Sequence, residues 1–423
     1  MTGGPTATGG RLGALAEPQF RLLWIGQAAS AAGDALIFVA VAFAVLQVGG
    51  SAADLGIVFA AFTVSNVALV LAGGVWADRL PRQFVMVACD IVRGVAEVIL
   101  ALLLISGAAQ VWHIALGAAV IGGAGAFFGP ASQGLIPQTV SAPRLQQANA
   151  LIGLSRNGTR IFGPPLAGAL IALFNSVGIV FLVDAVTFVV SAISLLLLRP
   201  APREARPAEP QPFFAELASG WREVTARPWI LAAICTFAVS NMAAAPFIIL
   251  GPVVAEEHLG GAAAWGLILT GGGIGGVIGG VLALRLRPRR PLMTGFMIMA
   301  ATSLPALALV GPLPVLLIAG ASMLSLIAIE LANTWWFTML QQHVPEHARS
   351  RVSSYDWLVS LVFQPLGFLL AGPLAARYGL TVTLVGAAVI GLLANYGVLL
   401  VRAVREVRWV QEVPAVAPGP DAA

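Results

Sequence analysis

Residues 73–80 read GGVWADRL and residues 279–286 read GGVLALRL, so two segments separated by 206 positions are identical in six of eight residues. A second pair of sites, each a proline followed by an arginine, has nearly the same offset. Pro137 and Arg144 lie 208 and 207 residues before Pro345 and Arg351. Two matches at almost one offset indicate that the chain was duplicated and consists of two similar halves.

The composition indicates that these halves lie in lipid. Apolar residues make up 58% of the chain and charged residues only 10%, with a mean hydropathy of +0.90. A soluble domain carries about 25% charged residues, so these charges are too few to cover a water-exposed surface. The net charge of +4 does not indicate nucleic-acid binding, because the basic residues fall in short loops between apolar runs.

Twelve apolar runs are long enough to cross a bilayer, which takes about 20 residues for a helix. We therefore expect an all-α polytopic membrane protein with twelve transmembrane helices in two pseudo-symmetric six-helix halves. The predicted division is a first half at 1–199, a linker at 200–226, a second half at 227–403 and a tail at 404–423. The predicted spans are 20–47, 55–77, 83–106, 111–134, 147–174, 178–199, 229–252, 262–284, 291–311, 313–338, 353–375 and 380–402.

The arginines predict the orientation of the spans. Nineteen arginines fall in the segments that lie on the cytoplasmic side when the N-terminus is inside, against Arg377 alone in the external loops. The positive-inside rule therefore places both termini in the cytoplasm. In the linker, Phe214, Leu217, Trp221 and Val224 have helical spacing, which predicts an amphipathic helix on the inner membrane face.

The loop after the second span resembles the signature loop of the major facilitator superfamily, Gly-x-x-x-Asp-Arg-x-x-Arg followed by a second basic residue. Gly74, Asp78, Arg79 and Arg82 match it, whereas Gln83 replaces the second basic residue and Pro81 stands where glycine is usual. The resemblance covers nearly the whole chain. It implies that this loop latches the outward-facing state through a contact between the halves.

Other passages are similar to the twelve-helix drug:proton antiporter branch, which includes macrolide-efflux and siderophore-exporter proteins. They are FRLLWIGQAASAAGD, FFGPASQGLIPQTV, RIFGPPLAG and QPLGFLLAGPL. Within the third, Gly163, Pro164 and Gly168 resemble the antiporter motif of helix 5, although Ala167 stands where glycine is common. Close helix packing explains these glycines equally well.

Ionisable residues inside the spans are costly, at about 2.5–3.5 kcal/mol each on insertion scales, and so mark candidate functional sites. Asp34 lies about 20 Å into the first span, near the membrane centre. Gln27 and Ser30 precede it on one polar stripe of the helix. Because helices 1, 4, 7 and 10 line the cavity in the superfamily, we expect Asp34 to exchange protons. The alternative is a structural aspartate that its neighbours neutralise.

Four further groups of residues complete the predicted site. Asp90, Arg93 and Glu97 share one face of the third span; neutralisation within this face is the favoured reading, and Glu97 remains a proton-coupling candidate. Glu330 is a third such candidate, or else the ion partner of Arg160, which could also bind an anionic substrate. Asp184 is expected to be a structural partner. The predicted cavity lining is Gln27, Ser30, Phe127, Phe128, Arg160, Asn241, Asn333 and Trp336.

The sequence and the resemblance together favour a proton-coupled exporter of amphipathic or hydrophobic small molecules, such as antibiotics or siderophores, in a bacterial inner membrane. The expected partners are this substrate, protons and the bilayer, the expected state is a monomer, and no cofactor, nucleotide or metal site is predicted. The first alternative is proton-coupled uptake of a small nutrient. The second is a membrane enzyme or a non-transporting receptor, although no nucleophile–base pair or ligand cluster lies in the spans.

Overall fold

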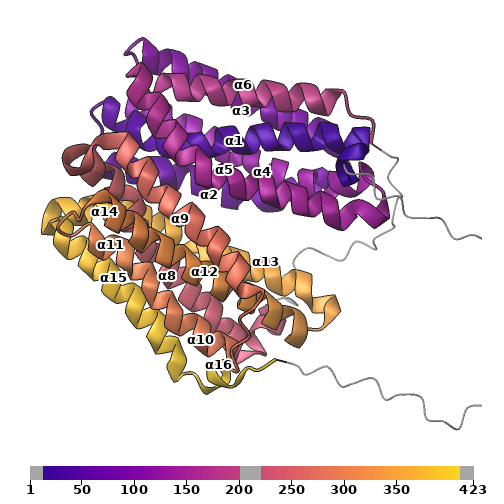
Figure 1. Ribbon diagram of the computed structural model, residues 1–423, viewed down its shortest axis with the longest axis vertical. Helices are drawn as coiled ribbons and strands as arrows, with labels where there is room; N and C mark the ends of the chain where they lie inside the picture. The colour runs from indigo at the N-terminus through magenta and orange to yellow at the C-terminus, as the bar shows by residue number, and fades with distance from the viewer. Residues whose placement is uncertain (1–12, 201–220, 410–423) are drawn as a thin grey trace, which may run out of the picture.

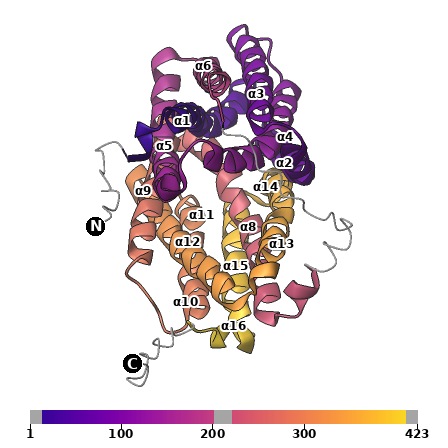
Figure 2. The same ribbon diagram turned by 90° about the vertical axis from the view of Figure 1, so that its right-hand side faces the viewer.

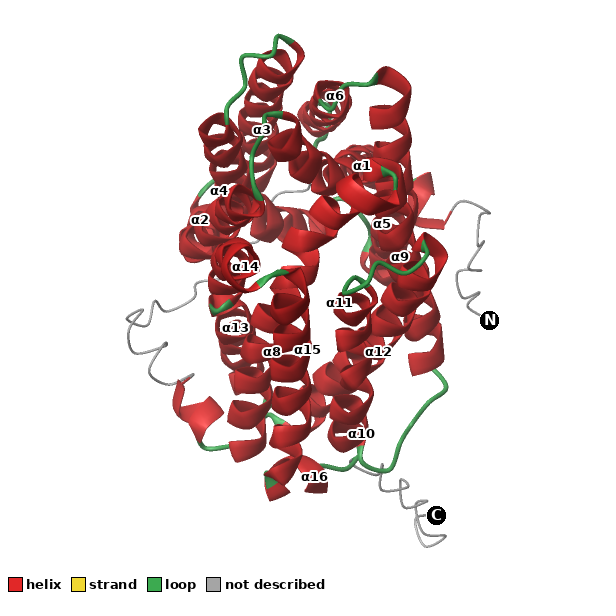
Figure 3. Ribbon diagram, turned by 90° about the vertical axis from the view of Figure 1, so that its left-hand side faces the viewer, coloured by secondary structure: helices red, strands yellow, loops and turns green. Residues whose placement is uncertain are grey.

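The computed structural model describes residues 13–200 and 221–409, and within them the side chains at 71–79, 346, 347, 350, 351 and 354 are not described. This described part consists of helices joined by short loops and contains no strand, as Figure 3 shows with helices in red and loops in green. Proline at the first helical position begins several helices, where its missing N–H leaves no bond unmade and its fixed φ suits the helix.

The N-terminal half contains six long helices. They are α1 (Pro18–Gln47), α2 (Ala52–Arg79), α3 (Arg82–Ile105), α4 (Val111–Leu135), α5 (Leu145–Phe174) and α6 (Gly178–Leu196). Each coincides with one of the predicted spans to within a few residues.

The C-terminal half repeats this order with two interrupted spans. Its helices are α8 (Pro228–Val254), α9 (Gly261–Ala283), α10 (Pro291–Ile298), α11 (Leu304–Ala308), α12 (Val315–His343), α13 (Glu346–Val362), α14 (Gln364–Tyr378), α15 (Leu380–Gly397) and α16 (Arg402–Glu406). A 3₁₀ turn at Met299–Ser303 joins α10 to α11. The break between α13 and α14 lies just before Pro365, which cannot donate a helical hydrogen bond.

Ten helical segments in the described part are long and apolar enough to cross a membrane. The two predicted spans that miss this criterion are α3 and α5. Asp90, Arg93 and Glu97 make α3 too charged, and Arg160 with two prolines lowers the hydropathy of α5. Both helices nevertheless pack lengthwise among the others, α3 against α4 and α6, and α5 against α1 and α9, so both run with the spans.

The two halves meet through two helix pairs that the internal repeat relates to each other. The main contacts between the halves are those of α5 with α9 and of α2 with α14. In the repeat, α2 corresponds to α9 and α5 to the span made of α13 and α14. The two contacts are therefore equivalent, which is the arrangement that a two-fold axis between the halves requires.

The halves touch at one end and separate at the other. We call the end at which Gly13 and Trp409 lie the terminal end, and the opposite one the far end. At the far end a single buried core takes side chains from both halves, whereas the terminal end has two separate cores, one in each half. Figure 1 shows the two groups of helices meeting at the left and diverging to the right, and Figure 2 shows them from the side.

Glycines allow the close approach at the far end. A Cβ on Gly56 of α2 would collide with the carbonyl oxygen of Phe368 in α14, and one on Gly372 of α14 would collide with the backbone of Ala53 in α2. Small residues of this kind let helix backbones pack tightly in lipid, where van der Waals contact drives association.

Gly56→Ala is expected to weaken the contact at the far end and to shift the protein toward states that are open there. The added methyl group cannot fit unless α2 and α14 move apart. Spin labels at Ser106 and Leu313, one in each half, should report a longer far-end distance in a background without the native cysteines. Gly386→Ala is the matched control, because a Cβ at Gly386 meets nothing within 4 Å. An unchanged distance distribution in Gly56→Ala would contradict the prediction.

The predicted linker helix lies partly outside the described residues, which do not include Phe214 and Leu217. Its end is helical from residue 221 to 225. There Val224 is fully buried in the terminal-end core of the C-terminal half, and Trp221 lies 5.6 Å from the ring of Tyr355.

Candidate functional site: a cavity between the halves

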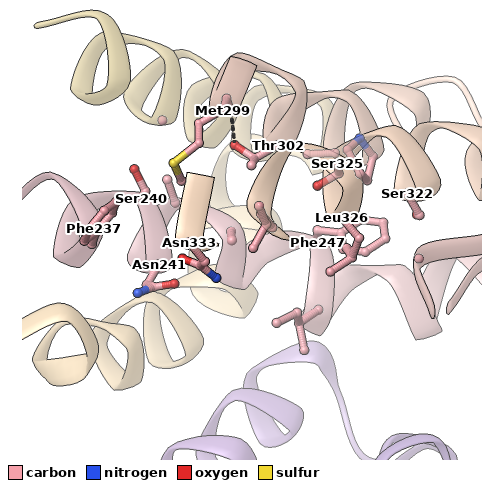
Figure 4. Close-up of a pocket in the computed structure, with 18 of the residues that line it drawn as sticks. Phe237, Ser240, Asn241, Phe247, Met299, Thr302, Ser322, Ser325, Leu326 and Asn333 are labelled. Carbon is pink, nitrogen blue, oxygen red and sulfur yellow. Dashed lines mark hydrogen bonds between the residues drawn. The ribbon is translucent and has the colours of Figure 1, made fainter. Parts of the chain in front are cut away.

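A cavity of about 760 Å³ lies between the halves, and helices of the C-terminal half form most of its wall. Of the described residues of the first half, Ala35 and Phe38 of α1 and Arg160 and Pro164 of α5 line it. The volume is in the range of small-molecule sites, which run from about 300 to 1,000 Å³. Figure 4 shows how the labelled side chains from α8, the α10–α11 segment and α12 surround this space.

The wall is largely apolar and aromatic, with isolated small polar groups. The aromatic members are Phe38, Phe237, Phe247, Trp336, Phe337 and Trp357, and the polar ones include Ser240, Asn241, Thr302, Ser322, Ser325 and Asn333. The rings of Phe237 and Trp336 meet edge to face at 5.2 Å. Thr302 donates its hydroxyl proton to the carbonyl of Met299, and Asn241 donates to the carbonyl of Ser360. Such a surface suits a molecule with a large apolar body and few polar groups.

Four of the eight predicted cavity residues line this space: Arg160, Asn241, Asn333 and Trp336. The other four, Gln27, Ser30, Phe127 and Phe128, are not among the residues that line this cavity. Gln27 and Ser30 are buried inside the N-terminal half, and both phenylalanines pack against its terminal-end core. The polar stripe on α1 therefore faces neighbouring helices of its own half, and α4 contributes nothing to the cavity wall.

Asp34 is not the lone carboxylate that the sequence predicted. Its Oδ1 lies 3.5 Å from a guanidinium nitrogen of Arg93 on α3, and half of its side-chain surface remains uncovered. Phe38, four residues further on the same face of α1, lines the cavity. Asp34 thus lies at the margin of the cavity, one helical turn toward the terminal end, and faces the interior of its half through Arg93.

Arg93 is the centre of this charged group. Its guanidinium is almost fully buried, pairs with Asp90 at 2.5 Å and lies between the rings of Phe128 at 4.5 Å and Phe188 at 4.2 Å. The aromatic faces and the carboxylates together replace the water that the cation has lost. The predicted neutralisation within α3 is therefore confirmed for Asp90 and Arg93, and the structure adds Asp34 from α1.

Arg160 and Glu330 form the ion pair that the sequence analysis gave as one of two alternatives for Glu330. The two charged groups are 3.7 Å apart across the halves, from α5 and α12, with 58% and 30% of their side chains exposed. The partial exposure allows solvent to screen the pair, so its static contribution is small, about 0–1 kcal/mol. Its position between the halves means that any movement of one half against the other changes the pair.

Glu330→Gln and Arg160→Gln are expected to change the transport rate in the same direction, and the double variant should be no worse than either single one. The reason is that each substitution breaks the same ion pair between the halves. Transport rates in membrane vesicles, measured as a function of pH, test this double-mutant cycle. Glu257→Gln, an exposed residue at the far end, is the control. Additive effects of the two substitutions would show that they act separately.

Asp356 is a cavity carboxyl that the sequence analysis missed. It lies on the wall of the cavity in α13, is nearly buried, and accepts hydrogen bonds from Trp336 Nε1 at 2.9 Å and from Ser360 Oγ at 3.3 Å. The sequence contained one signal for this residue. Asp356 lies close to the start of the predicted span at 353–375, and Ser360 follows it one helical turn on. A charged residue so close to a span end is ordinarily solvated. The burial of Asp356 follows from the packing of α13 against α12 and α8, which the sequence does not reveal.

The helix 5 motif packs α5 both within its own half and against the other half. Gly163 packs against Ala35 of α1, and Gly168 packs against the backbone of Ala262 in α9, while Pro164 borders the cavity. This position supports the packing role considered for the motif, because any side chain at Gly168 would push α5 away from α9.

Only part of the predicted latch can be described. Gly74, Asp78 and Arg79 lie in the last turns of α2, where side chains fall outside the description, so the latch stays a prediction. Arg82 donates a hydrogen bond to the carbonyl of Gly134 at the end of α4. This contact lies within the N-terminal half and joins the start of α3 to α4.

A pseudo-symmetric pair of helical halves around a cavity that is closed at one end defines a membrane transporter. The sequence matches the family profile of the Major Facilitator Superfamily over residues 23–360. The chain belongs to this superfamily, whose members are transporters and not enzymes, and the comparison confirms the twelve-helix fold.

Among curated relatives, the chain is 28% identical to the multidrug efflux pump Tap of Mycolicibacterium fortuitum over 367 residues, which is 83% of this chain and 88% of that protein. It is also 28% identical to the protein of the same name from Mycobacterium tuberculosis strain H37Rv, covering 86% of this chain and 89% of the relative. The chain is therefore a multi-pass membrane transporter related to efflux pumps.

Solved structures share the fold at low sequence identity. A bacterial homologue of the lysosomal transporter Spinster, in an inward-facing and unoccupied conformation, has a TM-score of 0.71 at 17% identity, covering 94% of this chain and 98% of that one. The nucleoside transporter NupG has a TM-score of 0.70 at 13% identity, covering 90% and 98%. At these identities the likeness concerns the fold.

Proposed function

We propose that this transporter exports amphipathic or hydrophobic small molecules, such as antibiotics or siderophores, across a bacterial inner membrane in exchange for protons. The observation that carries the proposal is the large aromatic and apolar cavity with few polar groups. The relatives named as multidrug efflux pumps support the same substrate class.

The direction of opening fits export. The arginine distribution supports a cytoplasmic location for the terminal end, and the halves are separated at this end and joined at the far end. The structure would then be inward-facing, ready to take a substrate from the cytoplasm. Rocking of the halves about the cavity would expose the same site to the other side, and a monomer suffices because the cavity lies within one chain.

Proton coupling requires a group that can gain and lose a proton near the substrate. Asp34 fits this role, because it lies one helical turn from Phe38 of the cavity wall and has a partner, Arg93, that can hold its ionised form. Protonation would release Arg93 from Asp34 without unpairing Arg93, since Asp90 still holds it at 2.5 Å. Arg93 would thus pair with both Asp34 and Asp90 when Asp34 is ionised, and with Asp90 when Asp34 is neutral.

The proposal is tested in everted membrane vesicles that have an acidic lumen, with a library of antibiotics, dyes and siderophores. An exporter that exchanges substrate for protons should discharge the pH gradient when a substrate is added and should accumulate this substrate in the lumen. An ionophore that collapses the gradient should stop the accumulation. Accumulation only in right-side-out vesicles would indicate uptake, and the absence of gradient-dependent transport would refute proton-coupled export.

A further inference from the structure

Glu97 of α3 and Asp184 of α6 form a buried pair of carboxyl groups inside the N-terminal half. Both residues have no exposed surface, and neither is among the residues that line the cavity. Their side chains lie within hydrogen-bonding reach of each other. The pair therefore links α3 to α6 at a place that substrate in the cavity does not touch.

The pair lacks the donors that two ionised carboxylates would need. Thr187 donates its hydroxyl proton to Oδ1 of Asp184 at 2.8 Å, but Oδ2 of Asp184 and both oxygens of Glu97 have no donor. Ionised carboxylates only accept hydrogen bonds, whereas one neutral carboxyl supplies an O–H group. A single proton between Glu97 and Asp184 would satisfy both side chains and remove the repulsion between two buried like charges.

The charged groups of the surrounding helices also favour one shared proton on Glu97 and Asp184. The carboxyls Asp34, Asp90, Glu97 and Asp184 face the buried Arg93, with Arg156 of α5 acting on Asp34 from a distance. Asp90 and Asp34 take the guanidinium of Arg93 as their partner. Among the described residues Glu97 and Asp184 are left without a cation of their own, and α4 places the ring of Phe128 against Arg93.

We propose that Glu97 and Asp184 share one exchangeable proton and so form a second proton-binding site, which fills and empties during the transport cycle. This inference rests on the proposed proton coupling. The sequence analysis expected Asp184 to be a structural partner. In this proposal Asp184 forms half of a proton-binding site, and Glu97 forms the other half.

The charge of Arg93 links this pair to Asp34. Arg93 and Glu97 are four residues apart on α3, so a small movement of the guanidinium can shift it from Asp34 toward the pair. When the shared proton leaves the pair and binds Asp34, one negative charge disappears at Asp34 and one appears at Glu97 and Asp184. Arg93 then follows this charge, and the total charge of the group is unchanged.

The backbone of α1 couples the Glu97–Asp184 pair mechanically to the position of Asp34. Gly33, next to Asp34, packs directly against the Asp184 carboxyl and the Thr187 hydroxyl, where a Cβ would collide with both. Any separation of Glu97 and Asp184 after loss of their proton would therefore displace α1 at the position that carries Asp34. Proton transfer and movement of the cavity helix α1 become linked at this contact.

Infrared difference spectroscopy of the purified protein tests the proposal, because a protonated carboxyl has a carbonyl band that a carboxylate lacks. We expect the wild-type protein to show such a band, and to change it with pH and on addition of a transported substrate. Glu97→Gln and Asp184→Asn should each remove the band, and the double variant should show no further change. Asp54→Asn, which alters a carboxyl paired only with nearby Ser51, is the control.

Transport provides the second measurement. In Glu97→Gln and Asp184→Asn, uphill export should fall by roughly 5- to 150-fold, the range of coupling between linked sites, while downhill exchange persists. A band that is absent from the wild type, or that ignores pH and substrate, would overturn the proposal and leave a fixed structural contact. A responsive band in a protein that transports nothing against a proton gradient would refute the proposed function and not this site. If these two variants do not fold, the band is measured in Asp34→Asn, which lacks the other carboxyl proposed to exchange a proton: a band that still changes with pH supports the pair, and its absence overturns the proposal.

Discussion

Asp34→Asn is expected to abolish export against a gradient while the protein remains folded in the membrane. Asparagine has nearly the same shape as aspartate but cannot take up a proton, so a substrate could no longer be exchanged for one at this position. The fold should survive, because Arg93 keeps its 2.5 Å pair with Asp90 when the 3.5 Å contact with Asp34 is lost. Uphill accumulation in everted vesicles should fall to the level of vesicles without the transporter.

The variant should still exchange substrate downhill, since Asp34 is not one of the residues that line the cavity. Ligand affinity and counterflow of labelled substrate therefore separate loss of coupling from loss of binding. Asp54→Asn removes another carboxyl of the same half at the start of α2 and should transport like the wild type. If Asp34→Asn accumulates substrate against a gradient at the wild-type rate, Asp34 does not carry the coupling proton.

Arg93→Gln should cause the largest loss of stability among the charged residues of the spans. It removes the cation from between two aromatic rings and leaves Asp90, which is 1% exposed, as a buried charge without its partner. Removing one partner of a buried pair costs about 3–5 kcal/mol, mainly because the remaining charge is uncompensated. The apparent melting temperature in detergent and the yield of monodisperse protein measure this loss.

A second substitution tests whether the unpaired charge of Asp90 causes this loss of stability. Arg93→Gln combined with Asp90→Asn removes both charges of the 2.5 Å pair and should recover most of the lost stability. The double variant should nevertheless fail in uphill transport, because Asp34 has lost Arg93. Arg402→Gln, at an exposed pair with Glu406 in α16, should leave the melting temperature unchanged. Equal instability of the single and double variants would show that packing between the rings, and not charge, is what Arg93 supplies.

The site therefore consists of two parts with different duties. The C-terminal half supplies most of the cavity wall, and the N-terminal half supplies the buried charges around Arg93. The two parts meet where α1 and α5 border the cavity and where Arg160 approaches Glu330. In the proposed mechanism a substrate would act on the halves at the cavity, and protons would act on the N-terminal half from within.

The amino-acid sequence alone determined the spans, their number and the repeat. Apolar runs of about 20 residues have one economical structure in a bilayer, because every backbone polar group must be bonded within the helix. The repeat at 73–80 and 279–286 also related α2 to α9, and hence predicted two equivalent halves. The high cost of charge in lipid singled out Asp34, Glu97, Arg160 and Glu330, since each must have a partner or a use.

Only the tertiary structure decided which of these residues meet and which face the cavity. The long helices α1, α8 and α12 are apolar around most of their circumference, so the sequence pattern does not show which side of each faces lipid, protein or cavity. The rotation and relative height of neighbouring helices depend on contacts such as Gly33 with Asp184, which join segments far apart in the chain. For this reason the pairing of Asp34 with Arg93 and the closeness of Glu97 to Asp184 could not be predicted from the sequence. The same holds for the position of Gln27 and Ser30 away from the cavity and of Asp356 in its wall.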